Sequence, residues 1–235
     1  MTTRSGRGRV IVFEGGEGSG KSTQLRRVAA GLERQQVPHV CLREPGGTTL
    51  GTAVRRVLLD PASDIEPRAE ALLFMASRAQ LVEREIRPAI ERGDVVLLDR
   101  FFLSTYAYQI EGHMLPERDV RNANAFATGG LVPDLTVLLT FPFAQGLARA
   151  AHRDTAHDRM EAMGNAFHER VAVALSSFSQ TEWQRQHPEC GPIVTVDAQG
   201  TEDDVSARVA EVLGSYWPDV FPLAAWTDVR EPDAT

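Results

Sequence analysis

The chain has 235 residues, of which 43% are hydrophobic, which is enough for one large domain. Its 25 Lys and Arg against 32 Asp and Glu give a formal net charge of -7, which argues against a general nucleic-acid-binding protein. The two cysteines, Cys41 and Cys190, lack metal-ligand spacing and indicate reduced thiols, as in a cytoplasmic protein. The basic N-terminal segment lacks the apolar stretch of a signal peptide, and no apolar run approaches the ~18 residues that cross a membrane. We therefore expect a cytoplasmic protein with no membrane or nucleic-acid partner.

Five short apolar runs are predicted to be strands, namely residues 10–13, 39–42, 95–98, 135–139 and 193–196. Nearly continuous apolar strands are typical of a parallel sheet that is buried on both faces. The segments between them are helix-length, as at 23–36, 68–92 and 205–213. This alternation predicts a three-layer α/β fold, in which a five-stranded parallel sheet has helices on both faces. Ligands of such sheets bind beyond the carboxyl ends of the strands, so functional residues are expected just after each strand.

A glycine-rich segment follows the first predicted strand and matches the phosphate-binding pattern G-x-x-x-x-G-K-[ST]. Glycines let backbone N–H groups turn inward around phosphate oxygens, and the start of the next helix adds partial positive charge. Lys21 would reach the outer phosphates, and the Ser22 hydroxyl would ligate Mg²⁺. A plain glycine-rich turn is the alternative, and the flanking strand and helix argue against it. The expected ATP-binding residues are Gly15, Gly16, Glu17, Gly18, Ser19, Gly20, Lys21, Ser22 and Thr23.

A predicted turn follows the second strand, at residues 43–48 with the sequence Arg-Glu-Pro-Gly-Gly-Thr. Pro45 and the two glycines favour a turn, and Thr48 can cap the next helix. A turn requires neither the Arg43 nor the Glu44 side chain. These two residues are therefore candidates for a binding site, and a solvated turn is the alternative.

Phe74 and Arg78 lie four residues apart in a predicted helix and therefore share a face. An aromatic ring and a guanidinium together could stack on a nucleobase and donate to its carbonyl. Taken alone, the phenylalanine fits a core position and the arginine a surface position.

Asp99 and Arg100 follow the third predicted strand. An acid at the end of an apolar strand, beside a phosphate loop, can hold Mg²⁺ or its waters. The adjacent guanidinium can bind phosphate oxygens as a fork. The alternative is a structural ion pair that caps the sheet.

A polar segment with three arginines follows the fourth predicted strand and its helix. Arg149, Arg153 and Arg159 suit a lid, expected at about residues 149–160, that closes over a triphosphate and neutralises transition-state charge. A solvated helix face is the alternative. One domain is expected to span residues 1–214, and the polar, proline-containing residues 215–235 are expected to form a C-terminal tail.

In this order and spacing, the motifs resemble those of bacterial thymidylate kinases, from about Arg9 to Leu213. The resemblance implies a P-loop NTPase fold and Mg²⁺-dependent transfer of a phosphoryl group from ATP to dTMP, which gives dTDP. It also implies a homodimer. The segments that carry it are FEGGEGSGKST at 13–23, REPGGT at 43–48, Phe74 with Arg78, DR at 99–100, STYAYQ at 104–109, PDLT at 133–136 and DRME at 158–161.

The resemblance further implies roles for individual residues. Glu17 would reach the sugar 3′-hydroxyl of dTMP, Phe74 would stack on thymine, and Arg78 would contact a thymine carbonyl. Pro45 is expected to be a cis-proline. The dTMP-binding residues that the resemblance implies are Glu17, Arg43, Phe74, Arg78, Arg100, Ser104, Thr105, Tyr108 and Gln109.

Gly18 occupies the loop position at which some relatives carry a catalytic arginine. The chain is therefore similar to the subclass that takes this arginine from the lid. Arg149 and Arg153 are the candidates, and Arg153 is favoured because it lies further into the predicted lid. The expected catalytic residues are Lys21, Asp99, Arg100, Arg149 and Arg153, and the expected metal ligands are Ser22 and Asp99.

Two positions depart from the family pattern. Phe101 stands where tyrosine or histidine is common, and Thr140 stands where relatives often carry aspartate. Three other functions remain open: a kinase for another nucleoside monophosphate, a switch or motor ATPase, and a non-catalytic nucleotide-binding module. ATP hydrolysis without an acceptor would favour the ATPase, and the intact Lys21, Asp99 and Arg100 argue against the module.

Overall fold

A five-stranded sheet forms the centre of the computed structural model, which describes residues 7–142, 145–146, 148–149 and 158–222. The strand order is β2-β3-β1-β4-β5, and every neighbouring pair is parallel. This confirms the predicted parallel sheet, and each strand continues past its predicted run at the carboxyl end. The strands are β1 (Arg9–Gly15), β2 (His39–Arg43), β3 (Val95–Asp99), β4 (Leu135–Thr140) and β5 (Ile193–Asp197).

Helices connect the strands in the described part of the chain. Two π-helical segments, η1 (Val82–Ile86) and η2 (Tyr106–Gly112), continue α3 and α5, and a 3₁₀ turn covers Pro188–Cys190. The predicted helix 68–92 is thus a continuous run of α3, η1 and α4. The α-helices are α1 (Lys21–Arg34), α2 (Thr49–Leu59), α3 (Pro67–Leu81), α4 (Arg87–Arg92), α5 (Phe102–Thr105), α6 (Glu117–Thr128), α8 (Asn165–Ser177), α9 (Thr181–Gln186) and α10 (Glu202–Tyr216).

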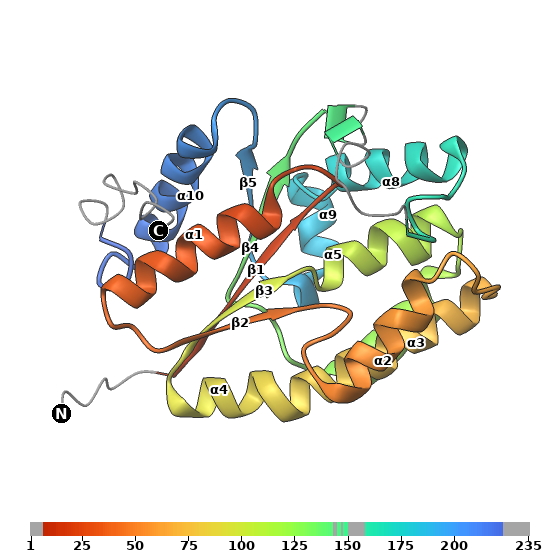
Figure 1. Ribbon diagram of the computed structural model, residues 1–235, viewed down its shortest axis with the longest axis horizontal. Helices are drawn as coiled ribbons and strands as arrows, with labels where there is room; N and C mark the ends of the chain where they lie inside the picture. The colour runs from red at the N-terminus through yellow and green to blue at the C-terminus, as the bar shows by residue number, and fades with distance from the viewer. Residues whose placement is uncertain (1–6, 143–144, 147, 150–157, 223–235) are drawn as a thin grey trace.

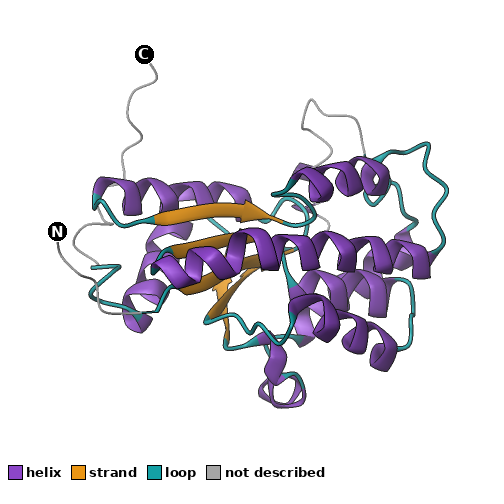
Figure 2. Cartoon of the chain, turned by 90° about the horizontal axis from the view of Figure 1, so that it is seen from below, coloured by secondary structure: helices purple, strands orange, loops and turns teal. Residues whose placement is uncertain are grey.

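Helices cover both faces of the sheet, as the edge-on view in Figure 2 shows. Helices α1 and α10 pack against each other on one face, and the remaining helices lie on the other (Figure 1). Strand β1 explains how both faces become apolar. Ile11 and Phe13 point into the cluster under α1 and α10, whereas Val10 and Val12 point into the opposite cluster. Side chains alternate along a strand, so a continuous apolar run supplies two cores.

The carboxyl ends of three strands are level with one another. In the strand register, Asp99 of β3 pairs with Phe13 of β1 and with Arg43 of β2. The segments that follow these residues therefore start at one edge of the sheet, where α/β folds bind their ligands.

The C-terminal part of the described chain stays packed against the domain. Helix α10 continues to Tyr216, and Val220 and Phe221 are buried in the cluster beneath α1 and α10. Contact with the domain therefore extends beyond residue 214, the predicted domain boundary. In the described residues, no helix has the length and apolar character needed to span a membrane.

Candidate active site

A cleft of about 1020 Å³ lies at the carboxyl edge of the sheet. Gly15 and Gly16 belong to the phosphate loop but do not line the cleft, and Arg153 lies outside the described residues. The structure brings the other predicted residues together around one space. They are Glu17, Gly18, Ser19, Gly20, Lys21, Ser22, Thr23, Arg43, Phe74, Arg78, Asp99, Arg100, Ser104, Thr105, Tyr108, Gln109 and Arg149.

The phosphate loop has a backbone that requires glycine. Gly15, Gly18 and Gly20 all have positive φ angles, of 144°, 68° and 86°. A Cβ atom on Gly18 would overlap the backbone oxygen of Gly146, so this position has no room for a larger residue. Left-handed backbone of this kind strains residues that carry a Cβ. The loop leads directly into α1, whose first N–H groups are available to an anion.

Lys21 is buried at the start of α1, and its Nζ donates a hydrogen bond of 2.7 Å to the Gly16 carbonyl. Burial, together with the nearby positive charge of Arg100, lowers the pKa of Lys21 from 10.5 to about 8. The carboxylates of Glu17 and Asp99 oppose this shift only in part. The site therefore favours a bound anion, which would restore the stability of the charged lysine.

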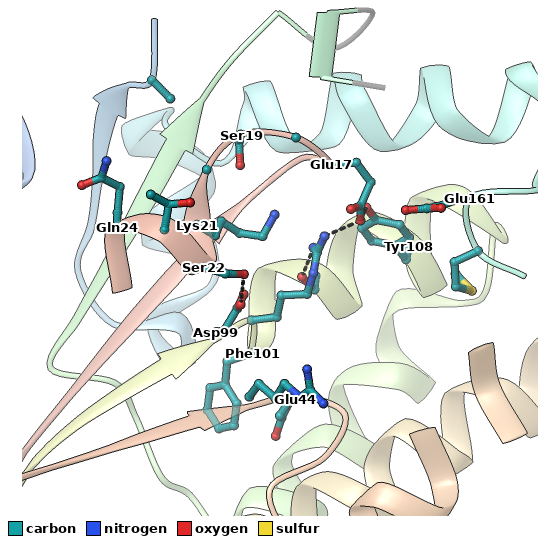
Figure 3. Close-up of a pocket in the computed structure, with 18 of the residues that line it drawn as sticks. Glu17, Ser19, Lys21, Ser22, Gln24, Glu44, Asp99, Phe101, Tyr108 and Glu161 are labelled. Atoms are coloured by element: carbon teal, nitrogen blue, oxygen red, sulfur yellow. Dashed lines mark hydrogen bonds and ion pairs between the residues drawn. The ribbon is translucent and has the colours of Figure 1, made fainter. Parts of the chain in front are cut away.

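Ser22 and Asp99 lie side by side, because the serine Oγ donates a hydrogen bond of 2.6 Å to Asp99 Oδ2 (Figure 3). A hydroxyl and a carboxylate oxygen are ligands that suit Mg²⁺, which is usually held by one or two protein groups together with substrate phosphates. Across the described residues, no group of three or more His, Cys, Asp and Glu could hold a metal by itself. The Ser22 and Asp99 oxygens fit a metal that is also bound by the phosphates of a nucleotide.

Arg100 is held in a strained conformation with φ of 70° at the end of β3. Its guanidinium forms an ion pair with Glu17 and donates to Ser104 Oγ at 2.9 Å. Burial alone would lower the pKa of Arg100, but Glu17 and the other carboxylates nearby raise it, so the group stays charged. Asp99 accepts from Ser22 and Arg100 pairs with Glu17, so the two adjacent side chains contact different partners.

Arg55 is a cleft residue that the sequence motifs did not indicate. It lies on α2, where it donates to the Pro45 carbonyl at 3.2 Å, and the Glu44–Pro45 bond is cis, as expected. Burial and the positive charges of Arg43 and Arg100 lower its pKa. The sequence feature that could have indicated Arg55 is its position next to Val54, on the inward side of an amphipathic helix. Arg43, Arg55 and Arg100 thus bring three positively charged groups together in the cleft.

Arg78 is buried, with 2% exposure, rather than on the surface as its residue type alone suggests. It donates to Glu44 Oε2 at 2.8 Å, to the Phe101 carbonyl at 2.8 Å and to Asn124 Oδ1. Its guanidinium also lies 4.8 Å from the centre of the Phe101 ring, which gives the departure at position 101 a packing role. Phe74, one turn earlier on α3, is half-buried and lines the same cleft.

Ser104, Thr105, Tyr108 and Gln109 project into the cleft from α5 and the π-helical segment η2. Residues four apart share a helix face, which places Ser104 with Tyr108 and Thr105 with Gln109. The Tyr108 hydroxyl donates to Glu17 Oε1 at 3.2 Å, which links this segment to the phosphate loop (Figure 3).

The opposite end of the cleft is formed by Arg149 and by the loop between β5 and α10. The Arg149 guanidinium lies 3.9 Å from the centre of the Phe141 ring. Residues of the 198–202 loop line the cleft, although no motif pointed to them. Thr140, the second departure from the family pattern, is exposed and donates to the Val196 carbonyl at 3.3 Å.

Comparison with known proteins supports the resemblance. The thymidylate kinase family model matches residues 13–205. A thymidylate kinase of Deinococcus radiodurans is 46% identical over 86% of this chain and 94% of that protein. Those of Rhizorhabdus wittichii and Thermosynechococcus vestitus are 43% and 40% identical, over 90% and 89% of this chain and 99% and 88% of those proteins. The match thus spans the phosphate loop, the cleft and nearly the whole sheet, and the chain belongs to the thymidylate kinase family.

Proposed function

We propose that the protein is a dTMP kinase that transfers the γ-phosphoryl group of ATP to dTMP, which yields dTDP. The observation that carries this proposal is that two groups of side chains suited to phosphate binding line one cleft. Lys21 and Ser22 form one set at the phosphate loop, and Arg43, Arg55 and Arg100 form the other. Relatives that are 40–46% identical carry the name thymidylate kinase, which supports dTMP as the acceptor.

Residues 15–23 would hold the donor ATP, with Mg²⁺ bound to Ser22, Asp99 and the phosphates. The metal would neutralise charge on the phosphate oxygens. Phosphoryl transfer depends mainly on positioning and charge stabilisation, so no covalent nucleophile is required. Lys21 would contact the outer phosphates.

The acceptor dTMP would lie between the phosphate loop and α3. Arg100, with Arg43 and Arg55 close by, would bind its phosphate, and Glu17 would accept from the 3′-hydroxyl. Phe74 would stack on the thymine ring. Arg78, Ser104, Thr105, Tyr108 and Gln109 would surround the base and sugar.

The lowered pKa of Lys21 predicts that ATP binding weakens in alkaline solution. Below pH 8 the free enzyme carries a charged lysine, and above it the lysine is increasingly neutral. Bound phosphates raise the pKa, so ATP binding must then take up a proton. We expect KM for ATP to be flat below pH 8 and to rise up to about tenfold per pH unit above it. Steady-state kinetics between pH 6.5 and 9.5 measures this.

Lys21→Arg is the matched control, because a guanidinium stays charged over this range. Its KM for ATP is expected to be higher than that of the unmodified enzyme but independent of pH. If the alkaline rise in KM persists in Lys21→Arg, another group is responsible for it.

We also propose that the protein is a cytoplasmic homodimer. Helices α2, α3 and α6 pack in sequence on one side of the molecule. They carry exposed apolar residues, namely Leu50, Val57, Leu72 and Phe126, and Phe126 is 92% exposed. Exposed apolar groups of this kind mark an interaction surface. Light scattering is expected to give twice the 25.8 kDa chain mass, and Phe126→Glu is expected to reduce it to one chain mass. A monomeric mass for the unmodified protein would contradict the dimer.

A further inference from the structure

Glu70 is a fully buried carboxylate that the proposed mechanism does not use. It lies on α3, and its Oε1 accepts a hydrogen bond of 2.8 Å from Gln109 Nε2. His113 Nε2 lies 3.0 Å from the same oxygen, and the other oxygen forms an ion pair with Arg159. Burying a carboxylate is costly unless it is paired, so this arrangement indicates a specific role.

The carboxylate is fixed in position from two sides. Arg159, which pairs with it, is itself anchored to the end of α2, because its Nε donates to the Leu58 carbonyl at 2.9 Å. Its backbone N–H donates to the Leu59 carbonyl at 3.1 Å. Although burial raises the pKa of Glu70, the nearby His113, Arg159 and Gln109 side chains outweigh this effect and lower it. Glu70 is therefore ionised near neutral pH.

An ionised carboxylate can only accept hydrogen bonds, so the Gln109 amide must turn its NH₂ group toward Glu70. The carbonyl oxygen of Gln109 is then the atom left to face away from Glu70. Gln109 lines the cleft, and no hydrogen bond to its side-chain oxygen, Oε1, is found within the described residues. The site thus presents an acceptor, rather than a donor, to a base bound beside Phe74.

We propose that Glu70 is a specificity-determining positioning residue, which selects pyrimidines with an N3–H group by fixing the orientation of the Gln109 amide. Thymine and uracil carry a proton on N3 that the Gln109 oxygen can accept. Cytosine carries a lone pair on N3, which would face that oxygen unfavourably. A site built to accept a hydrogen bond rejects analogues that lack the donor, because buried polar groups are left unpaired. This inference rests on the proposed dTMP site.

The test is the binding of three monophosphates, dTMP, dUMP and dCMP, to the full-length Glu70→Gln variant by calorimetry. Glutamine at position 70 can donate as well as accept, so the Gln109 amide is free to turn over. We expect Kd for dTMP and dUMP to rise together by roughly tenfold, because they share N3–H and differ only in the 5-methyl group. The Kd for dCMP is expected to stay the same or fall.

Two variants separate selectivity from general damage. Arg159→Lys keeps a positive charge beside Glu70, so Glu70 stays ionised and in contact with Gln109. The ratio of Kd for dCMP to Kd for dTMP should therefore stay at its original value. Glu70→Asp retains an acceptor-only group and should preserve the same ratio. If Glu70→Gln does not fold, Gln109→Met serves instead, and it should weaken dTMP and dUMP but not dCMP.

An equal rise in Kd for all three monophosphates would overturn the inference, as would an unchanged ratio in Glu70→Gln. Failure of the proposed function has a different signature. In that case the unmodified protein itself would not bind dTMP in preference to dCMP.

Discussion

Replacing Arg100 by methionine is expected to lower kcat/KM for dTMP by on the order of 10³-fold, with less than about twofold change in KM for ATP. Methionine keeps much of the side-chain length and removes the charge. The substitution deletes the group proposed to bind the acceptor phosphate. It also removes the positive charge that pairs with Glu17, so the Glu17 carboxylate repels the incoming phosphate more strongly. Steady-state kinetics with each substrate varied in turn measures both constants.

Arg185→Met is the matched control for this substitution. Arg185 is an exposed arginine on α9 that pairs with Glu182 within the same helix. Exposed pairs of this kind contribute little, so the control is expected to leave both constants unchanged. A parallel loss of ATP binding in Arg100→Met would mean that the arginine acts on the whole site. Unchanged kinetics would mean that the acceptor phosphate is bound elsewhere.

Arg153→Ala is expected to lower kcat by on the order of 10³-fold, with much less change in KM for dTMP. An arginine that acts on transition-state charge affects the chemical step rather than ground-state binding. The phosphate loop offers no arginine of its own, and a Cβ at Gly18 would overlap Gly146. The missing positive charge must therefore come from another segment, for which the predicted lid is the candidate.

Arg149→Ala is the comparison for Arg153→Ala. Arg149 lies at the edge of the cleft, against the Phe141 ring, and is expected to affect KM for ATP more than kcat. If the large loss of kcat occurs in Arg149→Ala instead, the two arginines exchange roles. If kcat changes in neither variant, the catalytic arginine is not in the lid.

The sheet could be predicted from the sequence because its signals are local. The run Val10–Phe13 is apolar throughout, and such a run is stable only when both of its faces are covered. A parallel sheet binds its ligands at its carboxyl edge, so the sequence predicts that Asp99, Arg100 and Arg43 lie near the phosphate loop. Their convergence in one cleft follows from the register of β1, β2 and β3.

Other features of the cleft depend on contacts between distant segments. Arg78 is buried only because Glu44, Asn124 and Phe101 meet around it, and these residues lie on three different parts of the chain. Arg55 likewise becomes a candidate phosphate-binding residue only because the fold places it in the same cleft as Arg43 and Arg100. The local pattern around each position, an amphipathic helix for Arg55 and the spacing from Phe74 for Arg78, does not by itself separate a buried arginine from a solvated one. Tertiary structure, and not propensity, determines these parts of the site.

The most direct test of the account is a phosphoryl-transfer assay with ATP, Mg²⁺ and five acceptors in parallel: dTMP, dUMP, dCMP, dGMP and AMP. Formation of ADP is followed by a coupled reaction, and the second product is separated and identified. We predict that ADP and dTDP form in equal amounts, with the highest rate for dTMP and almost no ADP without an acceptor. ADP release at the same rate with and without acceptors would contradict the account and favour an ATPase.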